Sequence, residues 1–68
     1  MSNFFRIKDY IINKTDLLRI DTREFYICDE AVYIIRFRFK TSSDLDIYCD
    51  SLEDREDTLN VLNKILSL

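Results

Sequence analysis

Few of the 68 residues in this chain carry side chains that commonly do chemistry. There is no histidine, so the usual general base and proton shuttle of enzymes is missing. Two cysteines, Cys28 and Cys49, are too few for a zinc site of the Cys/His type. The remaining Asp, Glu, Lys and Tyr residues fall into no catalytic spacing. We therefore expect no enzymatic activity, no cofactor and no metal.

The two cysteines are poor candidates for a nucleophile. Asp29 and Glu30 follow Cys28 directly, and their negative charges oppose the thiolate form that a nucleophile needs. Cys49 belongs to the apolar side of its predicted strand, where a cysteine behaves as a small hydrophobic residue. A disulfide between the two would require adjacent strands, and the sequence leaves that possibility open.

An acidic run, D-S-L-E-D-R-E-D, covers residues 50–57. Acids at the start of a helix are common because the helix dipole favours negative charge there. The run could instead hold a calcium ion, although it lacks the glycine and the ligand spacing of an EF-hand loop. It could also mimic the phosphates of a nucleic acid. The dipole interpretation is the simplest of the three.

A cationic stripe lies in the segment A-V-Y-I-I-R-F-R-F-K, residues 31–40. Alternation in a strand places one set of side chains on the core face: Tyr33, Ile35, Phe37 and Phe39. It places Arg36, Arg38 and Lys40 on the other face. These cations could bind a nucleic acid or a nucleotide, or they could pair with acids on a neighbouring strand.

The next strand supplies such acids. Leu45, Ile47 and Cys49 must share the core face with Phe37 and Phe39, which requires an odd number of residues in the connecting loop. A three-residue loop pairs Phe37 with Ile47 and Arg38 with Asp46; a five-residue loop shifts each pair by two. In both cases cations face Asp44 or Asp46. With a net charge of −3, this pairing argues against nucleic-acid binding, which stays as the alternative function.

The pattern of residue types predicts one α+β domain over residues 1–68. It comprises an antiparallel meander of four to five strands within residues 3–49 and one C-terminal helix packed on one face of the sheet. We expect breaks near Lys8, at residues 13–16, at residues 22–24 and at Asp29-Glu30. The helix spans about residues 51–67, with Asp50 or Ser51 as its cap and with Leu52, Leu59, Leu62 and Leu66 on its apolar stripe. The chain has neither glycine nor proline, so it has no glycine-rich phosphate loop.

The segment Y-I-I-N-K-T-D-L-L-R-I-D, residues 10–21, carries a resemblance. It is similar to a group of small, mostly uncharacterised bacterial and phage proteins in which a strand, an I-N-x-x-x-L turn and a second strand lead into a meander and a closing helix. Ile12, Asn13 and Leu17 are the matching residues. The resemblance implies this architecture and a bacterial or phage source, and it brings no catalytic residue with it.

The small size of the chain suggests how it is stabilised. A domain this short buries only about 60% of its unfolded surface, and oligomerisation is the remaining stabiliser when metals and several disulfides are absent. Apolar residues also exceed the needs of one core, which leaves an interaction surface formed by Val32, Ile34, Arg36, Arg38, Tyr48, Val61, Ile65 and Leu68. With no leader and no apolar run of about 20 residues, the chain is expected in the cytoplasm and not in a membrane. We expect a non-enzymatic interaction module that binds itself, or another protein, as a homo-oligomer or as a regulatory or inhibitory partner.

Overall fold

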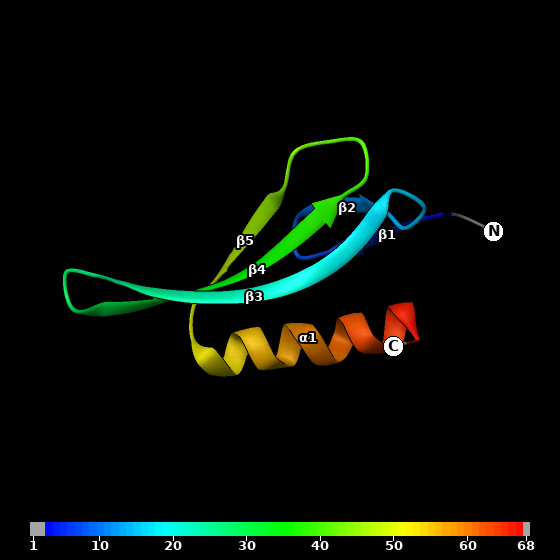
Figure 1. The fold of residues 1–68 in the computed structure, drawn as a ribbon. Coiled ribbons are helices and arrows are strands. Elements are labelled where there is room, and N and C mark those ends of the chain that lie inside the picture. The colour runs from blue at the N-terminus through cyan, green and yellow to red at the C-terminus, as the bar shows by residue number, and fades with distance from the viewer. Residues whose placement is uncertain (1–2, 68) are drawn as a thin grey trace.

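Five strands precede one helix in this protein, whose computed structural model describes residues 3–67. The elements are β1 (Phe4–Ile7), β2 (Tyr10–Asn13), β3 (Leu17–Ile27), β4 (Glu30–Phe39), β5 (Leu45–Cys49) and α1 (Leu52–Leu66) (Figure 1). This order confirms the predicted α+β class with a closing C-terminal helix. Within the described residues, no helix has the length and apolarity that crossing a membrane requires.

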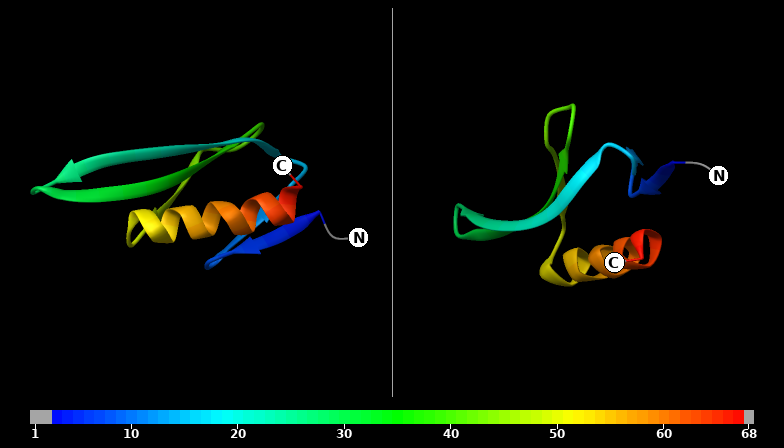
Figure 2. Two further views of the ribbon diagram at one scale, coloured as in Figure 1. Left: turned by 90° about the horizontal axis from the view of Figure 1, so that it is seen from below. Right: turned by 45° about the vertical axis from the view of Figure 1, so that its right-hand side comes forward.

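The strands form two antiparallel sheets. β3, β4 and β5 make a three-stranded sheet in that order, and β1 pairs with β2 in a separate hairpin. α1 packs against one face of the larger sheet, and the β1–β2 hairpin lies along the helix (Figure 2). The predicted turn at residues 13–16 is confirmed: the Asp16 amide donates to the Asn13 carbonyl at 3.2 Å, which redirects the chain from one sheet to the other.

A single core lies between the three-stranded sheet, the β1–β2 hairpin and α1. Its buried members come from the β1–β2 hairpin, from the helix-facing side of β4 and β5, and from α1: Phe5, Ile7, Ile12, Ile35, Phe37, Ile47, Cys49 and Leu62. Tyr33, Phe39, Leu45, Leu59, Ile65 and Leu66 pack around them and are partly buried. The alternation predicted for residues 31–40 and for residues 45–49 therefore sets the core face correctly.

Of the two predicted caps, Asp50 and Ser51, the helix uses Ser51. The Ser51 hydroxyl accepts a hydrogen bond from the Asp54 amide at 3.0 Å, which satisfies one of the free N–H groups of the first turn. The Asp54 carboxylate in turn accepts from the Asp50 amide at 3.0 Å. Leu62 is buried and Leu59 and Leu66 are half-buried, whereas Leu52, the first residue of the predicted stripe, is exposed.

The predicted break at residues 22–24 is wrong, because β3 runs without interruption for 11 residues. It pairs with β4 from Leu17↔Phe39 to Ile27↔Glu30, with one bulge between Leu17 and Arg19. A ten-residue β4 offers hydrogen-bonding partners along its whole length. That ladder outweighs the weak local preference for a turn in Thr22-Arg23-Glu24.

The β3–β4 turn lies one residue earlier than predicted, at Cys28 and Asp29, and both residues have positive φ angles, 50° and 65°. Two consecutive residues with positive φ form a two-residue hairpin turn whose backbone twist matches the twist of the flanking strands. Lys8, with φ of 51°, makes the predicted break between β1 and β2. In all three positions a residue with a Cβ atom adopts a conformation that glycine would adopt more easily.

Of the two loop lengths that parity allowed between β4 and β5, the structure has the longer. Phe37 pairs with Leu45, Ile35 with Ile47 and Tyr33 with Cys49. Each pair is therefore shifted by two residues from the three-residue-loop alternative. The shift brings Arg36 opposite Asp46 and moves Cys49 two residues closer to the β3–β4 turn, and β3 and β4 still extend past β5 there.

Candidate interaction surface

The hairpin of β3 and β4 extends past the rest of the molecule. The last pair between β4 and β5 is Tyr33↔Cys49, so residues 25–32, which we call the arm, have no third strand beside them within the described chain. The arm is the long projection in Figure 1, and it accounts for the elongated dimensions of 43 × 24 × 20 Å. A two-stranded ribbon alone is marginally stable in water, so an arm of this kind gains stability when something packs on it.

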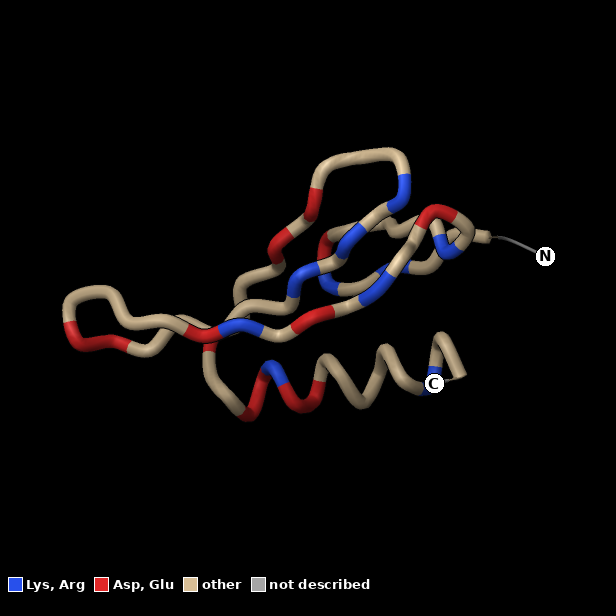
Figure 3. The backbone as a smooth tube through the Cα atoms, viewed as in Figure 1, with Lys and Arg blue, Asp and Glu red and all other residues tan. Residues whose placement is uncertain are grey.

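Large apolar side chains cover the arm on both faces. Phe25 and Ile27 alternate with Tyr26, and all three are exposed, with Tyr26 at 71%. Asp29 and Glu30 add negative charge at the tip, where the tube in Figure 3 is red. Beyond Glu24, the arm makes no side-chain hydrogen bond or ion pair with the rest of residues 3–67. Exposed aromatic and aliphatic residues in one place are typical of a binding surface.

One edge of the larger sheet is also free. Among the strands of residues 3–67, β3 pairs only with β4, so no described strand lies along its opposite edge over the 11 residues. A two-residue turn makes Ile27 and Glu30 a hydrogen-bonded pair, and alternation from that pair directs the backbone groups of Ile20, Thr22, Glu24 and Tyr26 away from β4. A long, unpaired edge of this kind can accept a strand from another chain.

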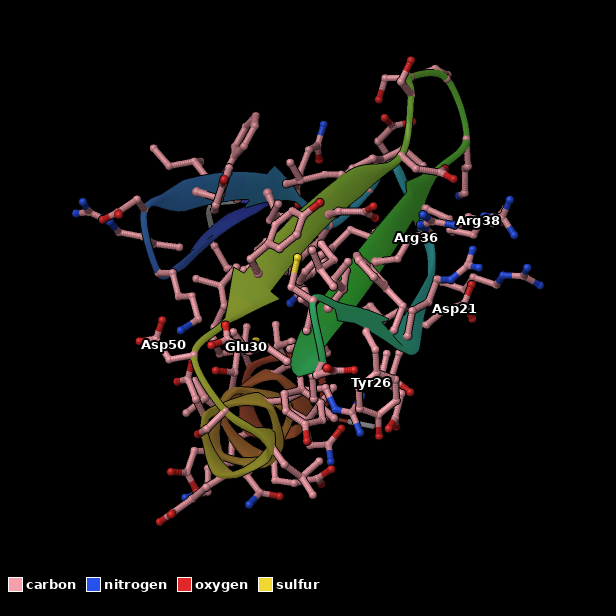
Figure 4. All side chains as sticks on the ribbon, turned by 90° about the vertical axis from the view of Figure 1, so that its left-hand side faces the viewer. Asp21, Tyr26, Glu30, Arg36, Arg38 and Asp50 are labelled. Atoms are coloured by element: carbon pink, nitrogen blue, oxygen red, sulfur yellow. The ribbon has the colours of Figure 1, made fainter. Side chains whose placement is uncertain are left out.

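The arginines of β4 are paired with acids, as parity predicted. Arg36 binds Asp46 through two hydrogen bonds, Nε to Oδ1 at 2.8 Å and Nη2 to Oδ2 at 3.0 Å. This bond from Arg36 holds the pKa of the Asp46 carboxyl below its usual range. Arg38 lies 3.4 Å from Asp44 and 3.9 Å from Asp21. Figure 4 shows Arg36, Arg38 and Asp21 together on the side of the sheet away from α1.

This pairing leaves little free positive charge for a polyanion. Four arginines lie on that sheet face (Arg19, Arg23, Arg36 and Arg38), together with three aspartates (Asp21, Asp44 and Asp46). Arg19 binds Asp21 at 3.1 Å. Arg23 makes no ion pair within the described residues. The predicted third cation, Lys40, is exposed at the end of β4 and donates its backbone N–H to the Asp16 carbonyl.

The residues predicted for the interaction surface lie on two sides of the molecule. Val32, Ile34, Arg36, Arg38 and Tyr48 share the sheet face away from α1, and Val61 and Ile65 lie on α1 itself. Tyr48 and Val61 are exposed, and Val32 is half-buried. Ile34 is only 2% exposed, because the longer side chains of Arg36 and Tyr48 flank it on the same face, so it offers no surface to a partner. Ile65 packs against the core, and Leu68 lies outside the described residues.

Arg55 joins α1 to the base of the arm. It is 8% exposed, its Nη1 donates to the Arg23 carbonyl at 3.2 Å, and its Nη2 lies 3.6 Å from Glu24. Its Nε is buried without a hydrogen-bond partner among the described residues. The joint fixes where the arm leaves the body of the molecule.

A groove lies on the helix side of the free β3 edge, at the opposite end of β3 from the arm. It has a volume of about 410 Å³ and is lined by Lys14, Leu17, Leu18, Arg19, Ile20 and Leu66. Leu18 is exposed there because the bulge after Leu17 turns it away from the core. The groove is therefore lined by four apolar side chains and by two cations.

The cysteines are unbridged, and the acidic run makes contacts that hold the helix in place. Cys28 and Cys49 are free thiols, so the disulfide that the sequence left open does not form. Burial is the main cause that raises the pKa of the Cys49 thiol. In the acidic run, Asp54 binds Lys8 at 2.9 Å and thereby ties α1 to the β1–β2 turn. No three His, Cys, Asp or Glu side chains among residues 3–67 are grouped as metal ligands would be.

Sequence reasoning missed the arm and the free edge, because a break at residues 22–24 divides β3 into two short strands. One signal could have identified them. Thr22-Arg23-Glu24 contains no glycine, proline or asparagine, and a ten-residue β4 needs a partner of similar length. Phe25, Tyr26 and Ile27 then fall beyond the reach of the five-residue β5.

Comparison of the chain with protein-family models, with curated proteins and with solved structures finds no match.

Proposed function

We propose that this protein is a non-enzymatic protein-interaction module that works as a homo-oligomer. The main support is the arm: a two-stranded ribbon with Phe25, Tyr26 and Ile27 exposed and with no helix or third strand of residues 3–67 covering it. A chain of 68 residues has a small core, and covering these side chains would add apolar burial at about 25 cal/mol per Å². A partner surface is the simplest source of that burial.

The chemistry of the remaining groups supports a binding role over catalysis. Cys49 is buried, and the Asp54 and Asp46 carboxylates are held by Lys8 and Arg36. The ion pairs on the outer sheet face also weigh against the nucleic-acid alternative, since each arginine engaged by an aspartate contributes little to phosphate binding. A reducing, cytoplasmic setting fits a free and exposed Cys28.

Light scattering at micromolar concentration tests the proposal. We expect a mass above the 8.2 kDa of one chain, and we expect the double variant Tyr26→Ser/Ile27→Ser to return it to one chain. The matched control is Tyr10→Ser/Ile11→Ser, which removes the same two residue types from another exposed hairpin and should leave the mass unchanged. A wild-type mass of one chain at every concentration contradicts the proposal. Loss of the oligomer in the control alone would place the interface on β2 instead of the arm.

A further inference from the structure

We infer that two copies of this chain pair through their free β3 edges, antiparallel and about a twofold axis at Thr22, so that the arm of each copy lies along the groove of the other. The inference rests on the proposed function, because it specifies how the module binds itself. The observation that supports it is that two copies of β3, placed antiparallel, match in length, in charge and in apolar contacts.

The length of β3 selects the centre of the pairing. β3 runs from Leu17 to Ile27, so Thr22 is its middle residue, and a twofold axis there pairs the strand along its whole length. Thr22 is also one of the residues that direct their backbone groups to the free edge. Two such residues facing each other form a hydrogen-bonded pair, with Cα atoms about 5.5 Å apart.

Charge selects the same centre. In this register Asp21 of one copy faces Arg23 of the other, and the pair occurs twice because of the symmetry. Arg23 is the arginine of this face that lacks an ion pair within the described part of the chain. A centre at Asp21 or at Arg23 would place like charges opposite each other, and a centre at Glu24 would place two glutamates face to face.

Shape and polarity agree at the two ends of the strand. The register brings Tyr26 of one copy opposite Leu18 of the other, at the wall of the apolar groove. Tyr26 alternates with Phe25 and therefore lies on the same side as Glu24, the side on which Arg55 and α1 lie. The groove opens on that side too, since Leu66 of α1 lines it.

The tip of the arm then meets the basic end of the groove. Asp29 and Glu30 of one copy come near Lys14 of the other, because the arm continues past Leu18 towards the β2–β3 turn. The tip of the arm is acidic, as the red segment in Figure 3 shows, and the groove with Lys14 and Arg19 lies at the opposite end of the same edge. An antiparallel pair places the acidic tip of one copy beside the cations of the other copy's groove. A parallel pair would place the two acidic tips side by side.

Cysteine cross-linking tests the register. In a Cys28→Ser background, Thr22→Cys faces its own copy across the axis at a separation that a disulfide can span, so mild oxidation should yield a covalent dimer. An equimolar mixture of Ile20→Cys and Glu24→Cys should give a mixed dimer, since these positions face each other. The exposed turn variant Thr15→Cys is the control and should form no covalent dimer, because the two copies of residue 15 lie at opposite ends of the paired strands.

A charge exchange gives a second, independent readout. Arg23→Asp alone should weaken the dimer roughly tenfold, because two acids then face each other at two places. The exchange Asp21→Arg/Arg23→Asp should restore most of the affinity. An oligomer that cross-links at other positions and ignores the exchange would overturn the register while leaving the proposed function intact. A single-chain mass for the wild-type protein would overturn both.

Discussion

The guanidinium carbon of Arg55 lies 5.3 Å from the centroid of the Tyr33 ring. This contact joins the second turn of α1 to the position on β4 where β5 ends and the arm begins. A cation over an aromatic face is attracted by the ring quadrupole, and the attraction is stronger when water is excluded, as it is at this buried arginine. The direction of the arm thus depends on one side chain of the helix.

Removing Arg55 should therefore loosen the joint. We expect Arg55→Ala to lower the free energy of unfolding by about 2–4 kcal/mol, since it removes the ring contact, the bond to the Arg23 carbonyl and buried methylene groups. Arg55→Met keeps an apolar stem and removes the unpaired Nε, so it should recover about half of that loss. Urea unfolding at one protein concentration measures both. Equal losses in the two variants would show that the methylene stem contributes little.

The helix cap gives a prediction that is independent of the arm. Ser51→Ala removes the acceptor for the Asp54 amide and should lower the free energy of unfolding by about 1 kcal/mol. Ser43→Ala, in the exposed β4–β5 loop, is the matched control and should have little effect, because Ser43 makes no hydrogen bond within residues 3–67. The same urea titration compares them, and equal effects would argue against the cap.

The arm turn is a place where the protein can be stabilised. Cys28 has φ of 50°, a region that costs a residue with a Cβ atom roughly 1–2 kcal/mol. We expect Cys28→Gly to raise the free energy of unfolding by about 0.5–1 kcal/mol after the greater flexibility of the unfolded chain is taken into account. Ser43→Gly, a position without a positive φ, should bring no gain. A loss at both positions would contradict this account of the turn.

The protein should lose stability in acid because two carboxyl groups, Asp46 and Asp54, become protonated. The pKa of Asp46 is lowered by the hydrogen bond from Arg36, and that of Asp54 by the bond from Lys8. A depressed folded-state pKa gives stability that is present above the unfolded value, about 3.9, and is lost as the pH falls through the folded value. We expect stability to hold from pH 7 to about pH 5 and to drop below about pH 4.

The double variant Asp46→Asn/Asp54→Asn measures their share of that drop. It should be less stable than the wild type at pH 7, and its stability should fall less steeply below about pH 4. Asp57→Asn, an exposed helix residue without an ion pair in the described chain, is the control and should keep the wild-type profile. Profiles that are parallel for all three proteins would exclude these two groups as the cause.

Local pattern predicted most of the core. Alternation in residues 31–40 and 45–49, helical spacing in residues 52–66 and the capping serine are short-range features. Side-chain parity alone placed Cys49 inside and the cations of β4 on the same face as Asp44 and Asp46. Parity could not choose between loops of three and five residues, because both keep the same faces together. That choice required the packed β4–β5 pair.

The sequence by itself determined the class of the fold, its core face and the neutralisation of the arginine stripe, since these follow from periods of 2 and 3.6 residues and from opposite charges on adjacent strands. Only the tertiary structure decided that β3 is one continuous strand with a free edge and that Phe25, Tyr26 and Ile27 project on an arm. Those features depend on the relative lengths of β3, β4 and β5 and on where Arg55 fixes the helix beneath them. Relative lengths are set by pairing between strands that are distant in the sequence, which no local pattern encodes.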